Sequence, residues 1–351
     1  MTNSAKTAIV VPCTAALMIG GFFLMRANIM SQILTTILAI IWGVASVILF
    51  FYSINLIAQN FKAKIYNKIV PYLFIGPAVL IMGYYLFIPT VRSLIFSFMS
   101  KDSSQFVGLK NYIQIFTDKT FLFALRNTLL WLLFGTGFSV LFGLIIAILA
   151  DKSYIERTAK TFIFIPMAIS MVGAGVIFKF MYAFKPAGDE QIGLLNALLC
   201  WMGGKPVDFL QISFWSNFFL IAIFIWLQTG FALVVLSAAL KAVPEELSEA
   251  ARIDGAGEFR ILIQIVIPNI RGSIISVSTT IFLAALKCFD IVYSLGKSVT
   301  GLDVLASLQY DQIFKYHNNG LGSAMAILIL LAVSPVIYYN LKEFKNREVF
   351  K

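Results

Sequence analysis

The chain has 351 residues, of which 60% are hydrophobic and only 13% are charged, and its mean hydropathy is +0.88. Because an ordinary soluble domain carries about 25% charged residues, this composition predicts a membrane protein and argues against a soluble enzyme, a secreted disulfide module and a nucleic-acid-binding protein. The net charge of +10 can be explained by basic loops on one side of a membrane. The three cysteines, Cys13, Cys200 and Cys288, form neither a disulfide framework nor a metal-binding pattern, so we expect free thiols.

Eight apolar runs are close to the roughly 20 residues that a helix needs to cross a bilayer. They cover residues 7–25, 33–58, 72–98, 121–150, 161–183, 211–240, 273–295 and 321–341. No clear cleavage site follows the first run, so we expect it to stay in the protein as a membrane span. The sequence therefore predicts an all-α integral membrane protein with eight transmembrane helices.

The distribution of Lys and Arg predicts the orientation of these spans. Fifteen basic residues lie in the two termini and in the second, fourth and sixth connections, whereas eight lie in the other connections. Positive charge is enriched in cytoplasmic loops, so we expect both termini in the cytoplasm. A basic stretch from Lys62 to Lys68 separates two spans within residues 1–60 from six spans within residues 61–351, and it is the predicted module boundary.

The sixth connection, residues 241–272, is long and nearly balanced in charge. Pro244 suits a first helical turn, and Glu245 and Glu246 complement the positive N-terminal end of a helix. Gly255 stands where a left-handed C-terminal cap is common. The pattern predicts a short helix, a break at the glycine and a second helix.

Ala250 and Ala251 give this short helix a face with almost no side chain. Such a face, flanked by charges, can enter a cleft on another protein without steric hindrance. A plain amphipathic helix at the membrane surface would explain the same residues, and the composition of the loop does not decide between the two.

The spacing of the loop residues matches a known signature. The signature begins with Glu249, Ala250 and Ala251 and continues with a glycine, Gly255. It ends with two isoleucines and a proline, at Ile265, Ile267 and Pro268. This pattern resembles the E-A-A-x-x-x-G-x9-I-x-L-P signature of binding-protein-dependent ABC importer permeases, with Ile267 in place of the usual leucine.

Other segments extend the resemblance over residues 70–345. The segment FVGLKNY at 106–112 is similar to the first external loop of sugar-type permeases, and Asn127 and Thr128 open the next span as in that group. The two additional N-terminal spans are similar to those of the larger, maltose-type permease subunits. The segments 189–196 and 285–293 most resemble α-glucoside permeases.

The resemblance implies a six-helix permease core with two additional N-terminal helices in the bacterial cytoplasmic, or inner, membrane. The protein would be the permease subunit of an ATP-driven importer for sugars, such as α-glucosides of the maltose, trehalose or sucrose type. It would work with a second homologous permease, two ATPase subunits that bind ATP and Mg, and an extracytoplasmic sugar-binding protein. The loop helix would dock into an ATPase through Glu245, Glu249, Ala250, Ala251, Arg252 and Gly255.

The sequence shows no nucleotide-binding or catalytic pattern. The phosphate-binding motif G-x-x-x-x-G-K-[ST] is absent, and its nearest candidates, at 204–206 and 296–298, lack the first glycine at the required position. His317 is the single histidine, so neither a His/Cys metal cluster nor a Ser/His pair can form. We therefore expect a non-catalytic subunit that itself binds no cofactor or metal.

Polar groups within the spans are candidates for a substrate pathway, because a charge at the centre of a membrane helix costs about 3 kcal/mol. Lys287 and Asp290 can pair on one face of the seventh span, either for function or only to orient the helix. Gln228 and Thr229 interrupt the sixth span and can bond sugar hydroxyls, with the ring of Phe231 against the apolar side of a sugar. The same polar groups can equally hold helices together.

The resemblance to maltose-type permeases implies a substrate site midway through the membrane, against the spans before and after the loop. The matching positions are Leu227, Gln228, Phe231, Ile281, Ala284, Ala285 and Cys288. The last four depart from the aromatic and amide residues of the maltose pattern, so a partner subunit can supply most of the sugar contacts. We expect Lys179, Tyr182, Trp201 and Trp215 to be interfacial anchors instead of ligands.

Two other classes of protein fit the hydropathy. A secondary transporter or a channel would have similar spans, but it would not need an alanine-faced loop helix, and the chain has few buried carboxylates for ion coupling. A membrane scaffold without transport activity would explain the spans but not the signature. Copurified ATPase subunits would indicate the importer, whereas proton-driven uptake by the chain alone would indicate a secondary transporter.

Overall fold

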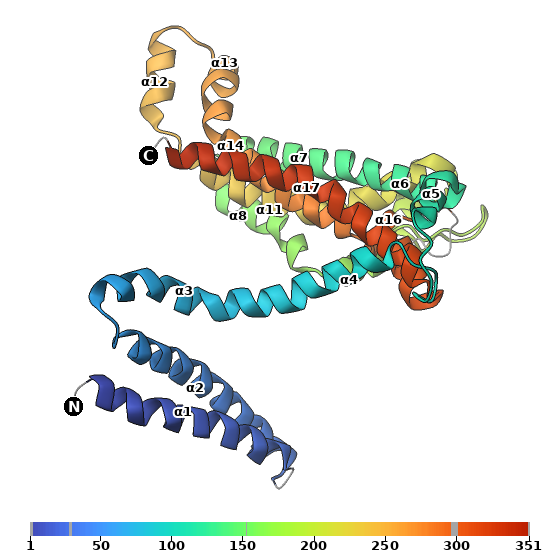
Figure 1. Ribbon diagram of the computed structural model, residues 1–351. Helices are drawn as coiled ribbons and strands as arrows, with labels where there is room; N and C mark the ends of the chain where they lie inside the picture. The colour runs from blue at the N-terminus through green and yellow to red at the C-terminus, as the bar shows by residue number, and fades with distance from the viewer. Residues whose placement is uncertain (1–2, 28–29, 152, 296–300, 350–351) are drawn as a thin grey trace. The chain divides into compact units, whose positions relative to one another are not determined.

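The computed structural model describes residues 3–27, 30–151, 153–295 and 301–349 (Figure 1). Within these ranges the regular elements are helices, and one isolated bridge joins Met99 to Phe106. The predicted all-α architecture is confirmed. Internal contacts divide the chain into two compact units, residues 1–91 and 92–351, which are described separately.

The first unit begins with the helices α1 (Asn3–Arg26) and α2 (Gln32–Ala58), which pack against each other. The Ser53 hydroxyl donates to the Thr14 hydroxyl at 3.0 Å, and Trp42 Nε1 donates to the Leu17 carbonyl at 3.1 Å. Gly21 permits this approach, because a Cβ there would lie 2.1 Å from Trp42 Nε1. Most other side chains of the pair are apolar and exposed, as in helices that face lipid.

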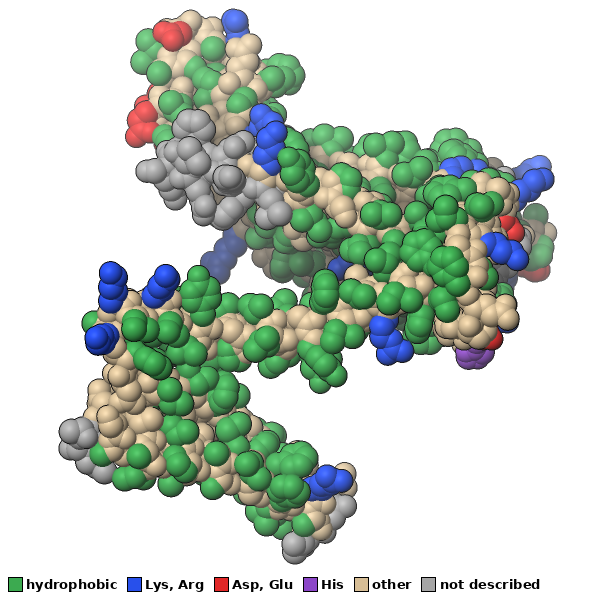
Figure 2. Space-filling model, viewed as in Figure 1, with side chains coloured by type: hydrophobic (Ala, Val, Ile, Leu, Met, Phe, Trp, Pro, Cys, Tyr) green, Lys and Arg blue, Asp and Glu red, His purple; other side chains and the backbone are tan. Residues whose placement is uncertain are grey.

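A long helical run follows, made of α3 (Ala63–Met82), the π-helical turn η1 (Gly83–Phe87) and α4 (Ile88–Phe96). It is 34 residues long and carries the chain from the first unit into the second. Its apolar side chains are largely exposed, and hydrophobic atoms cover much of the visible surface of α1, α2 and α3 in Figure 2.

The second unit is a helical bundle. Its elements from residue 110 to residue 241 are α5 (Lys110–Thr117), α6 (Lys119–Leu130), the π-helical turn η2 (Trp131–Gly135), α7 (Thr136–Ala150), α8 (Glu156–Phe164), the 3-10 turn η3 (Ile165–Ala168), α9 (Met171–Met181), α10 (Leu194–Trp201) and α11 (Ser213–Lys241). The elements that follow are α12 (Glu245–Ile253), α13 (Glu258–Ile261), the π-helical turn η4 (Leu262–Val266), α14 (Ile267–Lys287), α15 (Asp290–Leu295), α16 (Leu305–Tyr310), the π-helical turn η6 (Asp311–Lys315) and α17 (Asn319–Val349).

Helix α11 lies at the centre of this unit, in contact with α7, α8, α9 and α14. Its side chains Leu220, Phe224 and Leu233 are fully buried. The helix α7 comes very close at Gly143, where a Cβ would lie 2.4 Å from the Cβ of Ala232. The hydrophobic core of the second unit is therefore built around α11.

Seven helical runs among the described residues are long and apolar enough to cross a membrane, and a bent pair of helices raises the number to eight if it forms one span. The seven are Asn3–Arg26, Gln32–Ala58, Ala63–Phe96, Lys119–Ala150, Phe214–Lys241, Glu258–Leu295 and Asn319–Asn340. Each overlaps one of the predicted ranges, so the predicted membrane architecture is confirmed.

The fifth predicted span, residues 161–183, is not one straight helix. The run formed by α8 and η3 is bent by 101° against α9. Pro166 has no amide hydrogen with which to continue an α-helix. Ser170 then caps α9, because its hydroxyl accepts a hydrogen bond from the Gly173 N–H at 3.0 Å. The fifth predicted span therefore corresponds to a bent pair of helices.

Buried asparagines hold the non-helical loops of the second unit. Asn127 Nδ2 donates to the carbonyls of Gly301 and Asp303, at 2.8 and 2.9 Å. Asn196 donates to the Val207 carbonyl at 3.0 Å and accepts from the Val207 N–H at 2.8 Å. These amides satisfy backbone groups that have no partner within a helix.

The turn around Asp102 is held by hydrogen bonds to its carboxylate. The hydroxyls of Ser100 and Ser104 donate to it at 2.5 and 2.7 Å, and the Ser104 N–H donates at 3.3 Å. These donors favour the charged form and lower the pKa of Asp102 to about 2. The carboxylate is therefore charged at neutral pH and keeps the turn closed.

The four predicted interfacial anchors fall into two groups. Lys179, Trp201 and Trp215 are exposed, as expected. Tyr182 is buried, and its hydroxyl donates to the Phe219 carbonyl at 3.0 Å. The prediction for Tyr182 is therefore wrong, because the hydroxyl has a partner inside the bundle and needs no contact with the membrane surface.

Candidate functional site

Helix α12 is the short helix predicted within the loop 241–272. Pro244 was expected in the first helical turn. In the structure it is the N-cap residue, with ψ of 128°, one position before that turn. Glu245 and Glu246 occupy the first turn, where carboxylates stabilise the positive end of the helix. In Figure 1, α12 and α13 project together from one end of the bundle, and α5 and α16 lie at the other end.

Gly255 ends α12 in the left-handed conformation, with φ of +81°. Its N–H donates to the Arg252 carbonyl at 3.0 Å, and the Ala256 N–H donates to the Ala251 carbonyl at 2.9 Å. This pair of bonds is a Schellman motif, which terminates a helix and reverses the chain. The structure therefore contains the glycine break that the sequence predicts.

Arg252 and Glu258 join the helices on the two sides of this break. Arg252 Nε and Nη2 contact the two carboxylate oxygens of Glu258 at 2.5 and 3.1 Å. This paired hydrogen bond raises the pKa of Arg252 above its already high usual value. The family resemblance implies a docking role for Arg252, and in the structure its guanidinium links α12 to α13.

The surface of this loop combines small, acidic and large apolar side chains. Ala250 is exposed and Ala251 is half-buried. Close to them in the chain, Ile253 is 87% exposed and Phe259 is 76% exposed. Neither residue belongs to the predicted docking set, although a large apolar residue at the end of a polar helix is a sequence signal for Ile253. Ile253 and Phe259 are therefore candidates for a contact with another protein.

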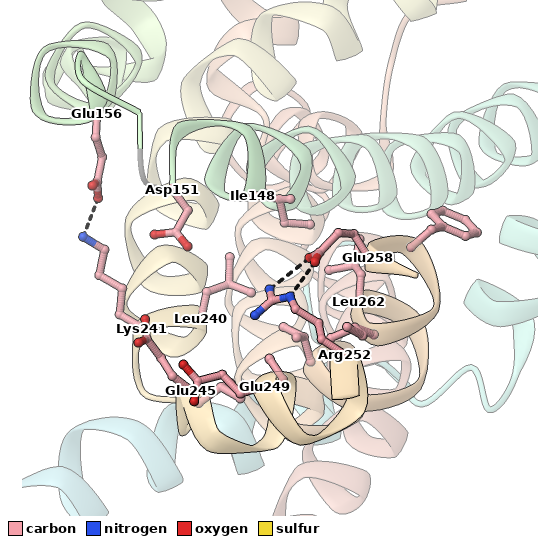
Figure 3. A pocket seen from close by; sticks show the side chains of 15 residues that line it. Ile148, Asp151, Glu156, Leu240, Lys241, Glu245, Glu249, Arg252, Glu258 and Leu262 are labelled. Atoms are coloured by element: carbon pink, nitrogen blue, oxygen red, sulfur yellow. Dashed lines mark hydrogen bonds and ion pairs between the residues drawn. The ribbon is translucent and has the colours of Figure 1, made fainter. Parts of the chain in front are cut away.

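A cavity of about 800 Å³ lies between α12, α13 and the adjoining ends of α7 and α11 (Figure 3). The charged side chains that line it are Asp151, Glu156, Lys241, Glu245, Glu249, Arg252 and Glu258. Figure 3 shows Arg252 paired with Glu258 on one side of the cavity and Lys241 reaching Glu156 on the other. The lining therefore carries more negative than positive charge.

Most of the candidate substrate residues lie together in the core of the second unit. One hydrophobic cluster contains Leu227, Ile281, Ala285 and Cys288, with Phe231 and Ala284 packed against it. The spans before and after the loop, α11 and α14, contact each other. Cys288 Sγ also lies 3.8 Å from Met171 Sδ at the start of α9. The structure thus brings together positions that are more than 50 residues apart in the chain.

The polar candidates on α11 differ in their surroundings. Gln228 is half-buried. Thr229 is buried, and its hydroxyl donates to the Ile225 carbonyl of the same helix at 2.7 Å. Thr229 also lines an apolar cavity of about 520 Å³ between α7, α8 and α11, together with Trp226. Of the two polar side chains, Gln228 is therefore the better candidate for a sugar contact.

Lys287 and Asp290 do not share one helical face. Helix α14 ends at Lys287, Cys288 has ψ of 106°, and α15 begins at Asp290. Lys287 is exposed and Asp290 is half-buried, and the three ion pairs found among the described residues do not join them. The break at Cys288 separates the two side chains, so the expected pairing on a continuous helix is corrected.

Comparison with known families agrees with the loop geometry. The pattern of the family described as "Binding-protein-dependent transport system inner membrane component" matches residues 139–346, which is more than half of the chain. The chain belongs to this family of ABC transporter permeases. The permease is thus the non-catalytic membrane component of its transport system, and it is not a secondary transporter, a channel or a scaffold.

Two curated relatives match nearly their whole length. The permease is 50% identical over 276 residues to the osmoprotective compounds uptake permease protein GgtC of Synechocystis sp., covering 79% of this chain and 99% of the relative. It is 43% identical over 327 residues to the α-glucoside transport system permease protein AglF of Rhizobium meliloti, covering 89% of this chain and 97% of the relative.

A solved structure shares the fold of the permease. The crystal structure of a bacterial alginate ABC transporter, in complex with an alginate pentasaccharide-bound periplasmic protein, contains a chain with a TM-score of 0.66 and 21% identity. The match covers 79% of this chain and 94% of that chain. In the part of the permease that the structure describes, no group of three or more His, Cys, Asp or Glu residues is placed to hold a metal ion.

Proposed function

We propose that this permease forms half of the translocation pathway of an importer for sugars, and that its substrates are α-glucosides. The similarity to AglF over 97% of that protein supports this substrate class. Identity is higher to GgtC, which is named for the uptake of osmoprotective compounds. Such compounds are therefore the alternative substrates against which α-glucosides must be tested.

The complete importer contains a second homologous permease, two ATPases that bind ATP and Mg, and an extracytoplasmic binding protein. Both termini and the loop 241–272 face the cytoplasm, and residues 1–60 form a module separate from the permease domain of residues 61–351. The excess of basic residues in the termini and even-numbered connections supports this orientation. Helix α12 at one end of the second unit, with α5 and α16 at the other, also agrees with it (Figure 1).

The observation that carries the proposal is the rigid construction of the docking helix. A Schellman motif at Gly255 ends α12, and the Arg252–Glu258 pair fixes α12 against α13. A helix held at both places can transmit a displacement without first deforming. The coupling residues of the proposal are therefore Glu245, Glu249, Ala250, Ala251 and Gly255, with Arg252 as their internal support.

The exposed side chains of the docking surface indicate which properties the partner's cleft must have. Glu249 and Asp254 are exposed carboxylates close in the chain to the exposed side chain of Ile253, and Glu245 is an exposed carboxylate in the first turn of α12. The matching ATPase cleft is therefore basic at its rim and has an apolar pocket for one isoleucine. Association with the ATPase should weaken as the salt concentration rises, because rim charges are screened by salt.

The substitution Gly255→Asp tests the docking proposal. Aspartate adopts a φ of +81° less readily than glycine does, so the substitution strains the end of α12. It also adds a negative charge to the docking surface. We expect the variant to insert normally and to lose uptake, measured as transport of labelled sugar into membrane vesicles. Ala251→Glu, which fills the small face of α12, should have the same effect.

Gly257→Asp is the matched control for this substitution. Gly257 has φ of −73° at the N-cap of α13, and a Cβ there would meet nothing within 4 Å. Aspartate is a favourable N-cap residue, so this variant should transport normally. Normal ATPase association and transport in Gly255→Asp would remove the docking assignment.

The substrate is tested with the reconstituted complex. We expect its binding protein, loaded with maltose, trehalose or sucrose, to stimulate ATP hydrolysis. Stimulation only by non-sugar osmoprotectants, with none by the three α-glucosides, would overturn the substrate class while leaving the docking proposal intact.

A further inference from the structure

An ion cluster joins α8 to the C-terminal end of α11. Glu156 Oε1 accepts a hydrogen bond from Lys160 Nζ and lies 2.6 Å from Lys241 Nζ (Figure 3). Lys160 also donates to the hydroxyl of Ser237, which is buried one turn before Lys241. The side chains of Glu156 and Lys160 are only 22% and 18% exposed. One carboxylate therefore holds two lysines at the same crossing of helices.

The same two helices are also in contact at backbone level, closer to the centre of the bundle. A Cβ at Gly230 would lie 2.6 Å from the Ile163 carbonyl oxygen and 2.8 Å from the Phe164 Cα. Gly230 precedes Ser237 by two helical turns, so the glycine and the ion cluster fall on one side of α11. The helix α8 is thus attached to α11 at two separate points, and the two helices are held as one body.

The ion cluster lies directly beside the docking helix. Lys241 is the last residue of α11, and α12 begins at Glu245, only four positions later. Glu156, Lys241 and Glu245 line the same cavity of about 800 Å³. A displacement of α12 therefore reaches Lys241 first and, through the ion pair, Glu156.

Beyond α8, the chain continues into the part of the bundle that holds the candidate pathway. The run of α8 and η3 meets α9 at the 101° bend. Helix α9 packs against α15, and a Cβ at Gly175 of α9 would lie 2.9 Å from the Ser294 Cβ. Met171 at the start of α9 contacts Cys288. A movement of α8 would thus pass to the break between α14 and α15.

We propose that Glu156 is a positioning residue for transport: it makes α8 follow the docking loop, so that ATPase movement reaches the bent span as well as α11. This inference rests on the proposed docking function. Glu156 touches neither nucleotide nor sugar in this account, and it acts through Lys241. Partly exposed ion pairs contribute little to folding stability, so its replacement should leave the protein folded.

The test uses the complete transporter purified from native membranes on a tag fused to this chain. Glu156→Gln keeps the shape of the side chain and removes its charge. We expect normal assembly and normal basal ATP hydrolysis, but stimulation by the loaded binding protein reduced about 5-fold or more, the size of a typical coupling between sites. Arg157→Gln, an exposed position on the same helix, is the matched control and should behave as the wild type.

Charge reversal separates positioning from a general structural role. Glu156→Lys and Lys241→Glu should each reduce stimulation, and the double variant should recover it, because Glu at 241 can then accept from both lysines of α8. A general structural defect would add in the double variant and would not be rescued. Unchanged stimulation in Glu156→Gln, or additive losses in the double variant, would overturn the proposal.

A distance measurement provides a readout that needs no sugar. Spin labels at Thr158 on α8 and Ala238 on α11, both exposed, report the separation of the two helices after the native cysteines are replaced. We expect one narrow distance with and without vanadate-trapped nucleotide, and a broad or shifted distance for Glu156→Gln only. A wild-type distance that itself changes on trapping would contradict the proposal.

The variants also distinguish the failure of this inference from the failure of the docking function. If Gly255→Asp is inactive and Glu156→Gln is normal, this inference alone fails. If Gly255→Asp is also normal, the docking function fails too.

Discussion

Gln228 is a half-buried amide beside the hydrophobic cluster that joins α11 to α14. Leu227 and Ile281, two of the candidate substrate residues in that cluster, have no polar group in their side chains. A sugar requires hydrogen-bond partners, so this subunit offers few of them in the middle of the bundle. We therefore propose that the amide of Gln228 is the main sugar contact of this chain and that a partner permease supplies most of the other contacts.

Replacing Gln228 with leucine tests this role. The variant should assemble normally and transport about 10-fold less sugar, because losing one hydrogen bond to an uncharged ligand group costs about 1 kcal/mol or somewhat more. Sugar-stimulated uptake into vesicles measures the effect. Thr229→Val is the control, since the Thr229 hydroxyl is already bonded to its own helix, and it should retain uptake. Unchanged uptake in Gln228→Leu would count against the assignment.

At single positions, the sequence predicted those features of the docking loop that depend on local backbone chemistry. The helix end at Gly255 could be predicted because few residues other than glycine adopt φ of +81° without strain. Ile253 was not singled out, because its exposure depends on the turn that follows it. The Glu156–Lys241 pair joins residues 85 positions apart, and no local pattern in the sequence links them.

Among the helices, the contact between α7 and α11 depends on the absence of a side chain at Gly143. A Cβ there would lie 2.4 Å from the Ala232 Cβ and 2.9 Å from the Leu233 backbone nitrogen. Backbone atoms cannot move aside as a flexible side chain can, so an added methyl group must separate the two helices. Small residues at such crossings allow close packing within membranes.

Gly143→Ala should therefore lower the stability of the permease by about 1–3 kcal/mol, the usual cost of overpacking a core. The matched control is Gly137→Ala on the same helix, where a Cβ would meet nothing within 4 Å. Alanine favours helix over glycine by up to about 1 kcal/mol, so the control should be equal or slightly more stable. Melting of the purified permease in detergent measures both, and a higher melting temperature for Gly143→Ala would contradict the packing.

For whole elements, apolar runs located the membrane helices but not their bends. The run 161–183 is apolar throughout much of its length, and hydropathy does not record that the helix direction changes between Pro166 and Ser170. The segment around Cys288 contains no proline or glycine that would predict a break in the helix. The bend in the run 161–183 comes from local chemistry at Pro166 and Ser170, whereas the break at Cys288 lies where α9 packs, more than 100 residues earlier in the chain.

Over the whole molecule, the N-terminal spans and the permease core serve different purposes in our account. GgtC is matched over 99% of its length by 79% of this chain, so a related permease needs about a fifth fewer residues. The core with its docking loop contains every residue that we assign to transport. We therefore expect the first two helices to be dispensable for assembly with the ATPases and for transport.

Removal of residues 1–60 tests this division. The shortened permease should still assemble with its ATPases and transport sugar, because α3 and all later helices remain. Removal of residues 1–100 also deletes α3 and α4 and should abolish transport. Copurification and vesicle uptake are the measurements. Complete loss of assembly in the shorter truncation would show that the module boundary near residue 60 is misplaced.

The most direct test of the account is the accessibility of Ile253, replaced by cysteine in a background without other cysteines. The side chain is 87% exposed in the isolated chain, so maleimide should label it rapidly in membranes that lack the ATPase. In the assembled transporter we expect strong protection at this position, while Lys64→Cys, exposed in the first turn of α3, is labelled equally in both. Equal and rapid labelling of position 253 with and without the ATPase would contradict the claim that α12 is the docking helix.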